Sequence, residues 1–238
     1  MTKGHLKRIA TPRSWSLERK THPWAVRPRS GPHGLRESIS LLHIVRDMLD
    51  YADIFKEAKK IINEGKVLVD GRIVRDVKRG IGLMDVIDIP LKKESFVVVV
   101  NKKGLLVLKS IKASEAKFKL LSLVNKTIVK GGRAQLNFHD GRNMIVETAA
   151  AKKFRVHDTV VLNLKDKSIK EQIKYENGAT VFVRNGSHKG ELAKIKDIQK
   201  TRSPMSNVVT LEGDGNEFRT IEDYIFVVGK DKPVLSVV

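Results

Sequence analysis

Apolar residues in this chain come in short runs separated by turn residues. No run is longer than Phe96 to Val100, and glycine-containing turns such as Asn101 to Gly104 and His139 to Arg142 follow strand-like segments. Short segments of this kind are typical of small antiparallel sheets and barrels. A membrane-spanning helix needs about 20 apolar residues, and Met1 to His5 leads into no apolar segment. We therefore expect no membrane span and no secretory signal.

The charge of the chain is strongly unbalanced. Lys and Arg total 46 against 27 acidic residues among 238, which gives a formal net charge of +19 and an isoelectric point of about 10.1. Such an excess repels itself in a compact chain and predicts a polyanionic partner, and nucleic acid is favoured over a membrane surface. The chain has no cysteine, which excludes disulfides, thiolate nucleophiles and cysteine-based zinc fingers and fits an intracellular protein.

Residues 1–37 are predicted to form an extended basic arm. Four prolines in this segment interrupt any helical period, and Glu18 is the main acidic counterweight. Trp15 and Trp24 supply apolar anchors that a purely solubilising, disordered tail would lack, so we expect the arm to order against RNA. The candidate RNA-binding residues of the arm are Lys3, Lys7, Arg8, Arg13, Trp15, Arg19, Lys20, Arg27, Arg29 and Arg36.

Residues 38–91 have the pattern of an α/β module with two helices. The residues that recur at helical spacing on the buried faces are Leu41, Ile44, Val45, Met48 and Leu49 in the first helix and Phe55, Ala58, Ile61 and Ile62 in the second. The second helix is expected to end at Gly65. The opposite face of this helix carries Lys56, Lys59, Lys60 and Asn63.

A hairpin is predicted after the second helix. Asp70-Gly71 lies between two short apolar runs, which is the strongest local hairpin signal, and Asp85 to Ile89 is expected to add a closing strand. A charged helical face is usually just a solvated face. Here a basic hairpin follows it directly, so we favour a continuous phosphate-binding surface. The candidates are Lys56, Lys59, Lys60, Arg72, Arg75, Lys78 and Arg79.

The rest of the chain is predicted to be mostly β-structure, with a central domain over residues 92–172 and a second over 173–238. Ser114 to Leu121 is expected to interrupt the strands with a short helix capped by Ser114. In the last domain, Gly186 and Gly190 permit backbone conformations closed to other residues. We expect the loop between them to face a phosphate backbone. Its candidate RNA-binding residues are Arg184, Ser187, His188 and Lys189.

Two His-Asp pairs could form an acid–base dyad, namely His139-Asp140 and His157-Asp158. Adjacent residues of a strand point to opposite sides, and Asp-Gly has an adequate explanation as a turn. The histidines lack metal-site spacing, and the chain has no Gly-x-x-x-x-Gly-Lys-Ser/Thr phosphate loop. We therefore expect structural roles for both pairs, no catalytic residue, no metal and no cofactor.

Two segments resemble known RNA-binding modules. Gly178 to Ile195 is similar to the KOW motif of small SH3-like barrels, although Ala193 stands where that motif often has a third glycine. Residues 38–91 resemble the S4-like RNA-binding domain through Ala58-Lys59, Gly65-Lys66-Val67 and Val69-Asp70-Gly71. Many members of that family open the first helix with an Arg-Leu-Asp triplet. Leu41-Leu42-His43 replaces it here, so Arg46 is the candidate for that RNA contact.

A wider resemblance spans the whole chain. The segments that carry it occur in the order His5-Leu6-Lys7-Arg8, Pro12-Arg13-Ser14-Trp15, Gly31-Pro32-His33, Met84-Asp85-Val86-Ile87, His139-Asp140-Gly141-Arg142 and Thr220-Ile221-Glu222-Asp223-Tyr224-Ile225-Phe226-Val227. Together they are similar to the ribosomal protein S4e family of the archaeal and eukaryotic small (30S-type) subunit, and the short C-terminus is more similar to archaeal members.

The resemblance implies an α+β multidomain ribosomal protein with a basic arm, an S4-like module, a central β domain and a C-terminal SH3-like KOW barrel. It implies a cytoplasmic, non-enzymatic constituent of the small ribosomal subunit that supports translation. The expected partners are small-subunit (16S-type) rRNA and neighbouring ribosomal proteins, with no membrane and no small-molecule substrate. Two alternatives are a ribosome-associated assembly or stress factor and an RNA-modifying enzyme, because S4-like modules also accompany pseudouridine synthases.

Overall fold

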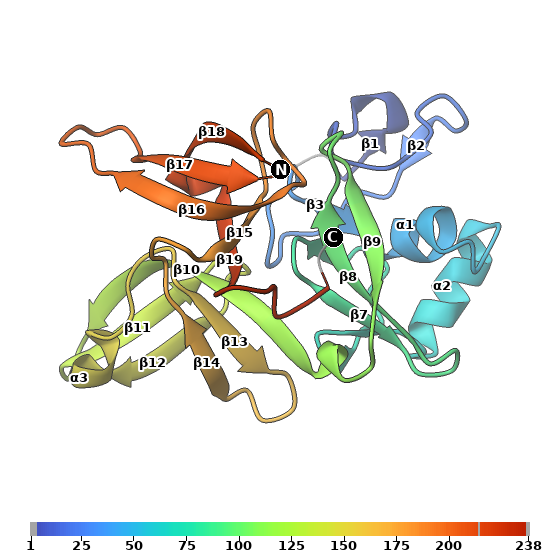
Figure 1. Ribbon diagram of the computed structural model, residues 1–238. Helices are drawn as coiled ribbons and strands as arrows, with labels where there is room; N and C mark the ends of the chain where they lie inside the picture. Colours follow the sequence, from blue (N-terminus) through green and yellow to red (C-terminus); the bar gives the residue numbers. More distant parts are fainter. Residues whose placement is uncertain (1–3, 214, 237–238) are drawn as a thin grey trace. The chain divides into compact units, whose positions relative to one another are not determined.

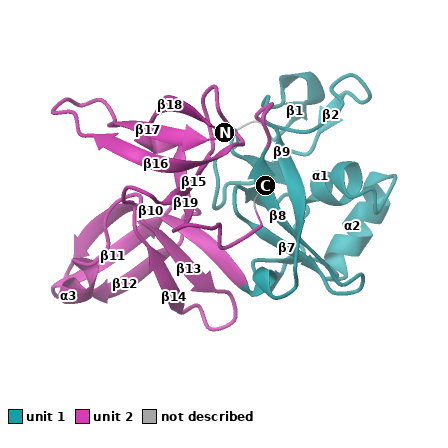
Figure 2. Ribbon diagram, viewed as in Figure 1, with its two compact units in different colours: residues 1–100, 105–117 teal, residues 101–104, 118–238 magenta. Residues whose placement is uncertain are grey.

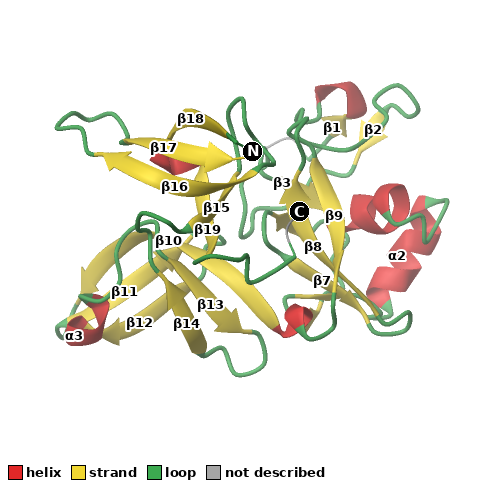
Figure 3. Cartoon of the chain, viewed as in Figure 1, coloured by secondary structure: helices red, strands yellow, loops and turns green. Residues whose placement is uncertain are grey.

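The computed structural model describes residues 4–213 and 215–236. The chain folds into two compact units: residues 1–100 with 105–117, and residues 101–104 with 118–238 (Figures 1 and 2). Strands dominate both units and helices are few (Figure 3). The expectation of a strand-rich α+β chain is confirmed at this level.

The basic arm of unit 1 is folded onto the module that follows it. Its short strands β1 (Leu6–Lys7) and β2 (Trp24–Ala25) pair antiparallel, and a 3₁₀ turn (Arg8–Ala10) follows β1. The apolar side chains Leu6, Leu17 and Val26 pack against the main core of unit 1, which includes Trp15. The tryptophan anchor therefore holds the described part of the arm in a defined conformation.

The helical part of unit 1 follows the predicted periodicity closely. Strand β3 (Ser38–Ser40) leads into α1 (Leu41–His43), which continues as a π-helical turn (Ile44–Met48), and α2 spans Phe55–Asn63. Ala58 and Ile62 are fully buried on α2, but Phe55 is 42% exposed, so its predicted inward position is wrong. Phe55 is the first residue of α2. Gly65 follows with φ +76°, as expected for a helix end.

The predicted hairpin is formed by β4 (Leu68–Val69) and β5 (Arg72–Ile73). Asp70 and Gly71 both have positive φ, 51° and 72°, which is the signature of a type I′ turn. β4 also pairs with β7 (Val86–Ile89), the predicted closing strand. Separately, β3 pairs with β6 (Gly80–Gly82).

The sheet of unit 1 continues across residue 91, where the sequence pattern predicted a domain boundary. β7 pairs with β8 (Glu94–Val100), which pairs with β9 (Leu106–Ile111), and the strand order is β5-β4-β7-β8-β9. Residues 90–93 make only a tight turn between antiparallel partners. Polarity along the chain cannot separate a hairpin turn of this kind from a linker.

Unit 2 contains two antiparallel sheets. The order of the first is β12-β11-β10-β13-β14 and that of the second is β18-β17-β16-β15-β19. The strands of the first sheet are β10 (Phe118–Val129), β11 (Arg133–Phe138), β12 (Asn143–Glu147), β13 (Thr159–Asn163) and β14 (Ile169–Ile173), with α3 (Thr148–Ala151) after β12. The strands of the second are β15 (Thr180–Val183), β16 (Leu192–Gln199), β17 (Val208–Gly213), β18 (Asn216–Ile221) and β19 (Ile225–Gly229), with a 3₁₀ turn (Glu222–Tyr224) before β19.

The helix predicted for residues 114–121 is wrong. Only Glu115–Lys117 form a single 3₁₀ turn, and the long strand β10 begins at Phe118. Leu120 and Leu121 are opposite Val161 and Val160 of β13 and are fully buried. Pairing with a strand some 40 residues later in the chain overrides the local helix-like pattern.

Candidate nucleic-acid interface

The basic face of α2 is arranged as the sequence pattern predicted. Lys56, Lys59, Lys60 and Asn63 are all exposed and lie opposite the buried Ala58 and Ile62. They line a shallow hollow of about 390 Å³ together with Glu64. The carboxylate of Glu64 is occupied by Lys66, 2.5 Å away, and this pair lowers the pKa of Glu64. The hollow is therefore a cationic surface with amide hydrogen-bonding capacity at its edge.

The hairpin extends this basic surface. Arg72 and Arg75 are exposed, whereas Lys78 and Arg79 are half-buried. A Cβ built at Gly65 would lie 2.9 Å from a methyl group of Ile73 and 3.7 Å from Nε of Arg75. The hairpin side chains therefore lie directly beside the end of α2. We call the exposed cations of the helix face and the hairpin the α2–hairpin surface: Lys56, Lys59, Lys60, Arg72 and Arg75.

Five of the candidate cations in the arm are exposed, namely Lys7, Arg13, Lys20, Arg29 and Arg36. Lys3 lies outside the described residues. Arg27 is half-buried. The half-buried Arg19 donates hydrogen bonds to the carbonyls of Ile9 (3.2 Å), Thr11 (3.0 Å) and Pro12 (2.9 Å), so it shapes the arm from within. The exposed cations remain candidate phosphate contacts, whereas Arg19 fixes the arm's backbone.

Arg8 and Trp15 are buried, which contradicts their assignment as RNA contacts. Arg8 is 3% exposed, and its guanidinium donates to the Glu18 carbonyl and lies 3.8 Å from Asp47. Trp15 is 2% exposed, with its ring 5.6 Å from that of His43. A positive charge and an aromatic ring in a basic segment resemble surface contacts in the sequence. Here both side chains are buried and stabilise the fold of unit 1, so we exclude both from the interface.

His43 connects the arm to the first helical segment. Its Nε2 accepts a hydrogen bond from the backbone N–H of Val26 at 3.0 Å, and its Nδ1 donates to Asp47 at 2.5 Å. This pattern requires the neutral ring. Arg46 binds the same carboxylate through Nε and Nη2, at 3.1 and 3.0 Å. The substitute RNA contact proposed at Arg46 is therefore half-buried and already paired with Asp47.

The environment shifts both titratable groups of this pair. Burial is the main cause that lowers the pKa of His43 below 6.5, against the opposing effect of Asp47. Burial raises the pKa of Asp47, but hydrogen bonds from His43 and Arg46 outweigh it and lower the pKa to about 2. Neutral His43 beside a carboxylate anion is thus the form that the folded protein favours. Sequence spacing gave no sign of this cluster beyond the unusual Leu41-Leu42-His43 triplet.

We expect unit 1 to lose stability as the pH falls below about 6.5. Unfolded chains then protonate His43, whereas the folded protein with its lowered pKa does not. The slope is at most about 1.4 kcal/mol per pH unit for one proton. Protonation of Asp47 lowers the stability further only between pH 3.8 and about 2, because its pKa in the folded protein is about 2. Urea unfolding between pH 8 and 5 should show a flatter slope for His43→Gln, while the exposed His22→Gln control keeps the wild-type slope. Equal slopes for all three proteins would contradict the expectation.

The glycine loop between β15 and β16 has the predicted backbone. Gly186 and Gly190 have φ of 93° and 81°, in the region that other residues rarely adopt. Ser187 is exposed, as expected for a contact residue. The half-buried His188 ring stacks on Phe218 with 3.9 Å between centroids. The Nε of Arg184 donates to the Asp223 carbonyl at 2.7 Å. Ser187 and the half-buried Lys189 are thus the better placed of the four candidates.

The two His-Asp pairs are used structurally in unit 2. Asp140 is buried, and its carboxylate forms ion pairs with the ammonium of Lys119 at 3.0 Å and the guanidinium of Arg142 at 2.9 Å. Asp158 is also buried and accepts hydrogen bonds from the backbone N–H groups of Arg155 (2.7 Å) and Tyr175 (2.9 Å) and from Gln172 (2.8 Å). Each carboxylate therefore has charged or hydrogen-bonding partners within the fold. The burial of Lys119 was not predicted, because a lysine in a basic chain is normally expected on the surface.

Neither a metal cluster nor a membrane helix is found in the described part of the chain. Among residues 4–213 and 215–236, no three His, Asp or Glu side chains gather in a way that could hold an ion. Of the helices that the structure describes, none has the length and apolarity to cross a bilayer.

Comparison with known proteins places this arrangement in a class of multidomain RNA-binding ribosomal proteins. The family model described as "Ribosomal family S4e" matches residues 92–169, the RS4NT domain matches 2–36 and the S4 domain matches 56–87. The small ribosomal subunit protein eS4 of Methanothermobacter thermautotrophicus is 45% identical over 236 residues, 99% of this chain and 96% of that protein. The eS4 protein of Methanocaldococcus jannaschii is 43% identical over 240 residues, 98% of this chain and 97% of that protein.

A solved structure supports the same assignment. The crystal structure of the 30S ribosomal protein S4e from Thermoplasma acidophilum is similar with a TM-score of 0.71 and 36% identity, over 85% of this chain and 99% of that one. The chain belongs to the ribosomal protein S4e family.

Proposed function

We propose that this chain is a non-enzymatic, structural constituent of the small ribosomal subunit that binds 16S-type rRNA in the cytoplasm of an archaeal cell. Neighbouring ribosomal proteins are its further partners. The observation that carries the proposal is the α2–hairpin surface, which lies on the segment that the S4 domain model matches. The relatives named above are ribosomal proteins, so we do not retain the alternative of an RNA-modifying enzyme.

The division of labour within the chain follows from the placement of its cations. The arm (1–37) and the S4-like module (38–91) supply the exposed cations that pair with phosphates. The central β segment (92–172), whose strands β8 and β9 complete the sheet of unit 1, acts as a spacer. The C-terminal segment (173–238) acts as a KOW-type SH3-like barrel that presents Ser187 and Lys189 from its glycine loop. Several modules on one chain multiply affinity for a single folded RNA, although each binds weakly alone.

Binding to folded small-subunit rRNA tests this proposal. If the chain neutralises about 6–10 phosphates, its affinity should fall roughly 10³–10⁵-fold between 50 and 200 mM salt. Filter binding of the purified full chain would measure this fall, with a random RNA duplex as the control. If the affinity for folded rRNA were no greater than that for the duplex, a specific binding site on the subunit would be contradicted.

Sedimentation distinguishes a permanent constituent from an assembly or stress factor. We expect the chain to remain with 30S-type particles through a high-salt wash, because several modules would have to dissociate together. A chain that is lost from the particles in that wash would support the factor instead.

A further inference from the structure

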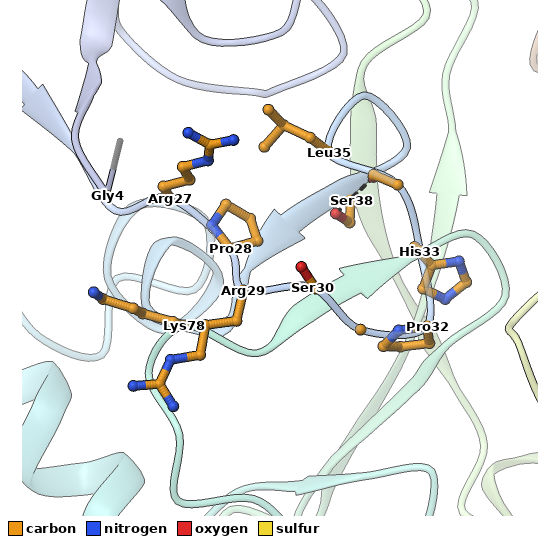
Figure 4. Close-up of a pocket in the computed structure, with 12 residues that line it drawn as sticks. Gly4, Arg27, Pro28, Arg29, Ser30, Pro32, His33, Leu35, Ser38 and Lys78 are labelled. Atoms are coloured by element: carbon orange, nitrogen blue, oxygen red, sulfur yellow. Dashed lines mark hydrogen bonds between the residues drawn. The ribbon is translucent and has the colours of Figure 1, made fainter. Parts of the chain in front are cut away.

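A second concave site lies in the arm, away from the α2 helix face. Residues 27–35 together with Gly4, Ser38 and Lys78 line a pocket of about 710 Å³ (Figure 4). All of these residues belong to unit 1. The volume lies in the range of small-molecule and nucleotide pockets. Arg27, Arg29 and Lys78 were predicted RNA contacts, but no sequence pattern predicted that they line one pocket, because the arm residues form only a proline- and glycine-rich stretch.

The walls of the pocket are held by hydrogen bonds from both sides. The backbone N–H of Arg29 donates to the Lys78 carbonyl at 2.8 Å, which joins the arm to the segment after the hairpin. The Ser38 hydroxyl donates to the Gly34 carbonyl at 2.9 Å and closes the loop. The ring of His33, 3% exposed, pairs with the buried Asp85 carboxylate at 3.0 Å. The pocket is thus formed before any ligand arrives.

The lining combines cations with small apolar groups. Arg27, Arg29 and Lys78 are its charged members, and none of the described residues that line it is acidic. In Figure 4 the charged ends of Arg29 and Lys78 lie on the same side of the pocket, and Pro32 and His33 lie on the other. Among the described residues, the Lys78 ammonium and the Ser30 hydroxyl have no hydrogen-bond or ion-pair partner. Arg29 is 3.5 Å from Asp76, but at 70% exposure that pair is weak and exchangeable.

We propose that this pocket binds an unstacked nucleotide of single-stranded RNA. Its phosphate lies against Arg29 and Lys78, and its base packs against Pro28, Pro32 and Leu35. A duplex presents its phosphates on a convex surface and keeps its bases stacked inside. A hollow of this size, lined by residues 27–35 with Gly4, Ser38 and Lys78, therefore fits a nucleotide that has left the stack. The inference rests on the proposed function and adds a second mode of RNA recognition to it.

Blocking the pocket without straining the backbone tests the proposal. A Cβ at Gly34 would meet no atom within 4 Å, and one at Gly31 would meet only the Arg29 carbonyl at 3.8 Å; neither glycine has positive φ. Gly34→Phe and Gly31→Phe should therefore fill the pocket in a folded chain. Lys78→Met removes the unpaired ammonium, and Lys112→Met is the matched control, because Lys112 is an exposed lysine of the same unit. Circular dichroism confirms that each variant folds.

The probes are a fluorescein-labelled heptauridylate, an RNA duplex and 5′-AMP, with fluorescence anisotropy for the RNAs and calorimetry for the mononucleotide. We expect Gly34→Phe, Gly31→Phe and Lys78→Met to weaken heptauridylate binding about tenfold, in line with the loss of one stacked base or one phosphate contact. Duplex affinity should change less than twofold, and Lys112→Met should match the wild type. A 4-thiouridine in the oligonucleotide should crosslink within residues 27–38.

Three results would overturn the proposal. The first is unchanged heptauridylate affinity in all three pocket variants while the wild-type chain still binds folded rRNA, and this result leaves the proposed function standing. The second is 5′-AMP binding as tight as that of the oligonucleotide, which would assign the pocket to a free nucleotide. The third is crosslinks that map only to α2. Failure of the wild-type chain to bind any RNA would instead refute the proposed function itself.

Discussion

Reversing the charge of Lys56, Lys59 and Lys60 to glutamate is expected to weaken binding to folded small-subunit rRNA at least 100-fold at physiological salt. Lys56, Lys59 and Lys60 are exposed on one face of α2, and Arg75 of the hairpin lies beside Gly65 at the end of that helix. Each lost phosphate contact lowers the slope of log affinity against log salt by about 0.9, so the triple variant should lose nearly three units of slope. The free energy of unfolding should change little, because the side chains are solvated.

A triple variant in unit 2 controls for the change in net charge. Lys165, Lys167 and Lys174 are exposed just outside strands β13 and β14 of that unit, and glutamate at these positions changes the charge by the same amount. We expect the control to lose much less affinity than the α2 variant. Equal losses in both variants would show that the chain binds RNA through its overall charge, and that the α2–hairpin surface has no special role.

Asp140→Asn is expected to destabilise unit 2 by about 3–5 kcal/mol. The Asp140 carboxylate and the Lys119 ammonium are 3.0 Å apart, with side chains 1% exposed. Burial raises the pKa of Asp140, but the charge of Lys119 and a hydrogen bond from the Arg142 backbone outweigh it and hold the pKa below 3.8. Asparagine keeps an acceptor for that N–H but leaves the ammonium buried without its anion, which is the costly outcome. Urea unfolding measures the change.

Lys119→Met supplies the matched comparison. It also breaks the pair, but the carboxylate retains the Arg142 guanidinium at 2.9 Å, so we expect a smaller cost than for Asp140→Asn. A double-mutant cycle with Lys119→Met and Asp140→Asn then isolates the coupling between the two charges. The account would be wrong if Asp140→Asn cost less than about 1 kcal/mol or if the order of the two variants were reversed.

Local patterns predicted the helices and the hairpin of unit 1 because those features depend on neighbours in the sequence. The Asp70-Gly71 turn needs positive φ at both positions, and few residue pairs other than this one adopt it readily. Apart from Phe55, the buried faces of the two helices follow from periodicity. The same reasoning placed the basic face of α2 correctly on the surface.

Long-range partners decided the features that the sequence pattern missed. Arg8 is buried because it donates a hydrogen bond to the Glu18 carbonyl and pairs with Asp47. Lys119 is buried because it forms an ion pair with Asp140. Strand β10 replaces the expected helix because β13 pairs with it. In each case the deciding contact lies ten or more residues away in the chain. No count of charges or apolar spacings within a short window contains that information.

The pairing of the arm has a consequence for synthesis of the chain. The backbone N–H groups of Val26 and Arg29 donate to His43 and to the Lys78 carbonyl, and His33 pairs with Asp85. The Ser14 carbonyl accepts a hydrogen bond from the N–H of Leu106. The first segment to be translated is therefore among the last to be completed. Until about the hundredth residue has left the exit tunnel, the nascent arm lacks these partners, and we expect it to behave as an unfolded polycation with both indoles exposed.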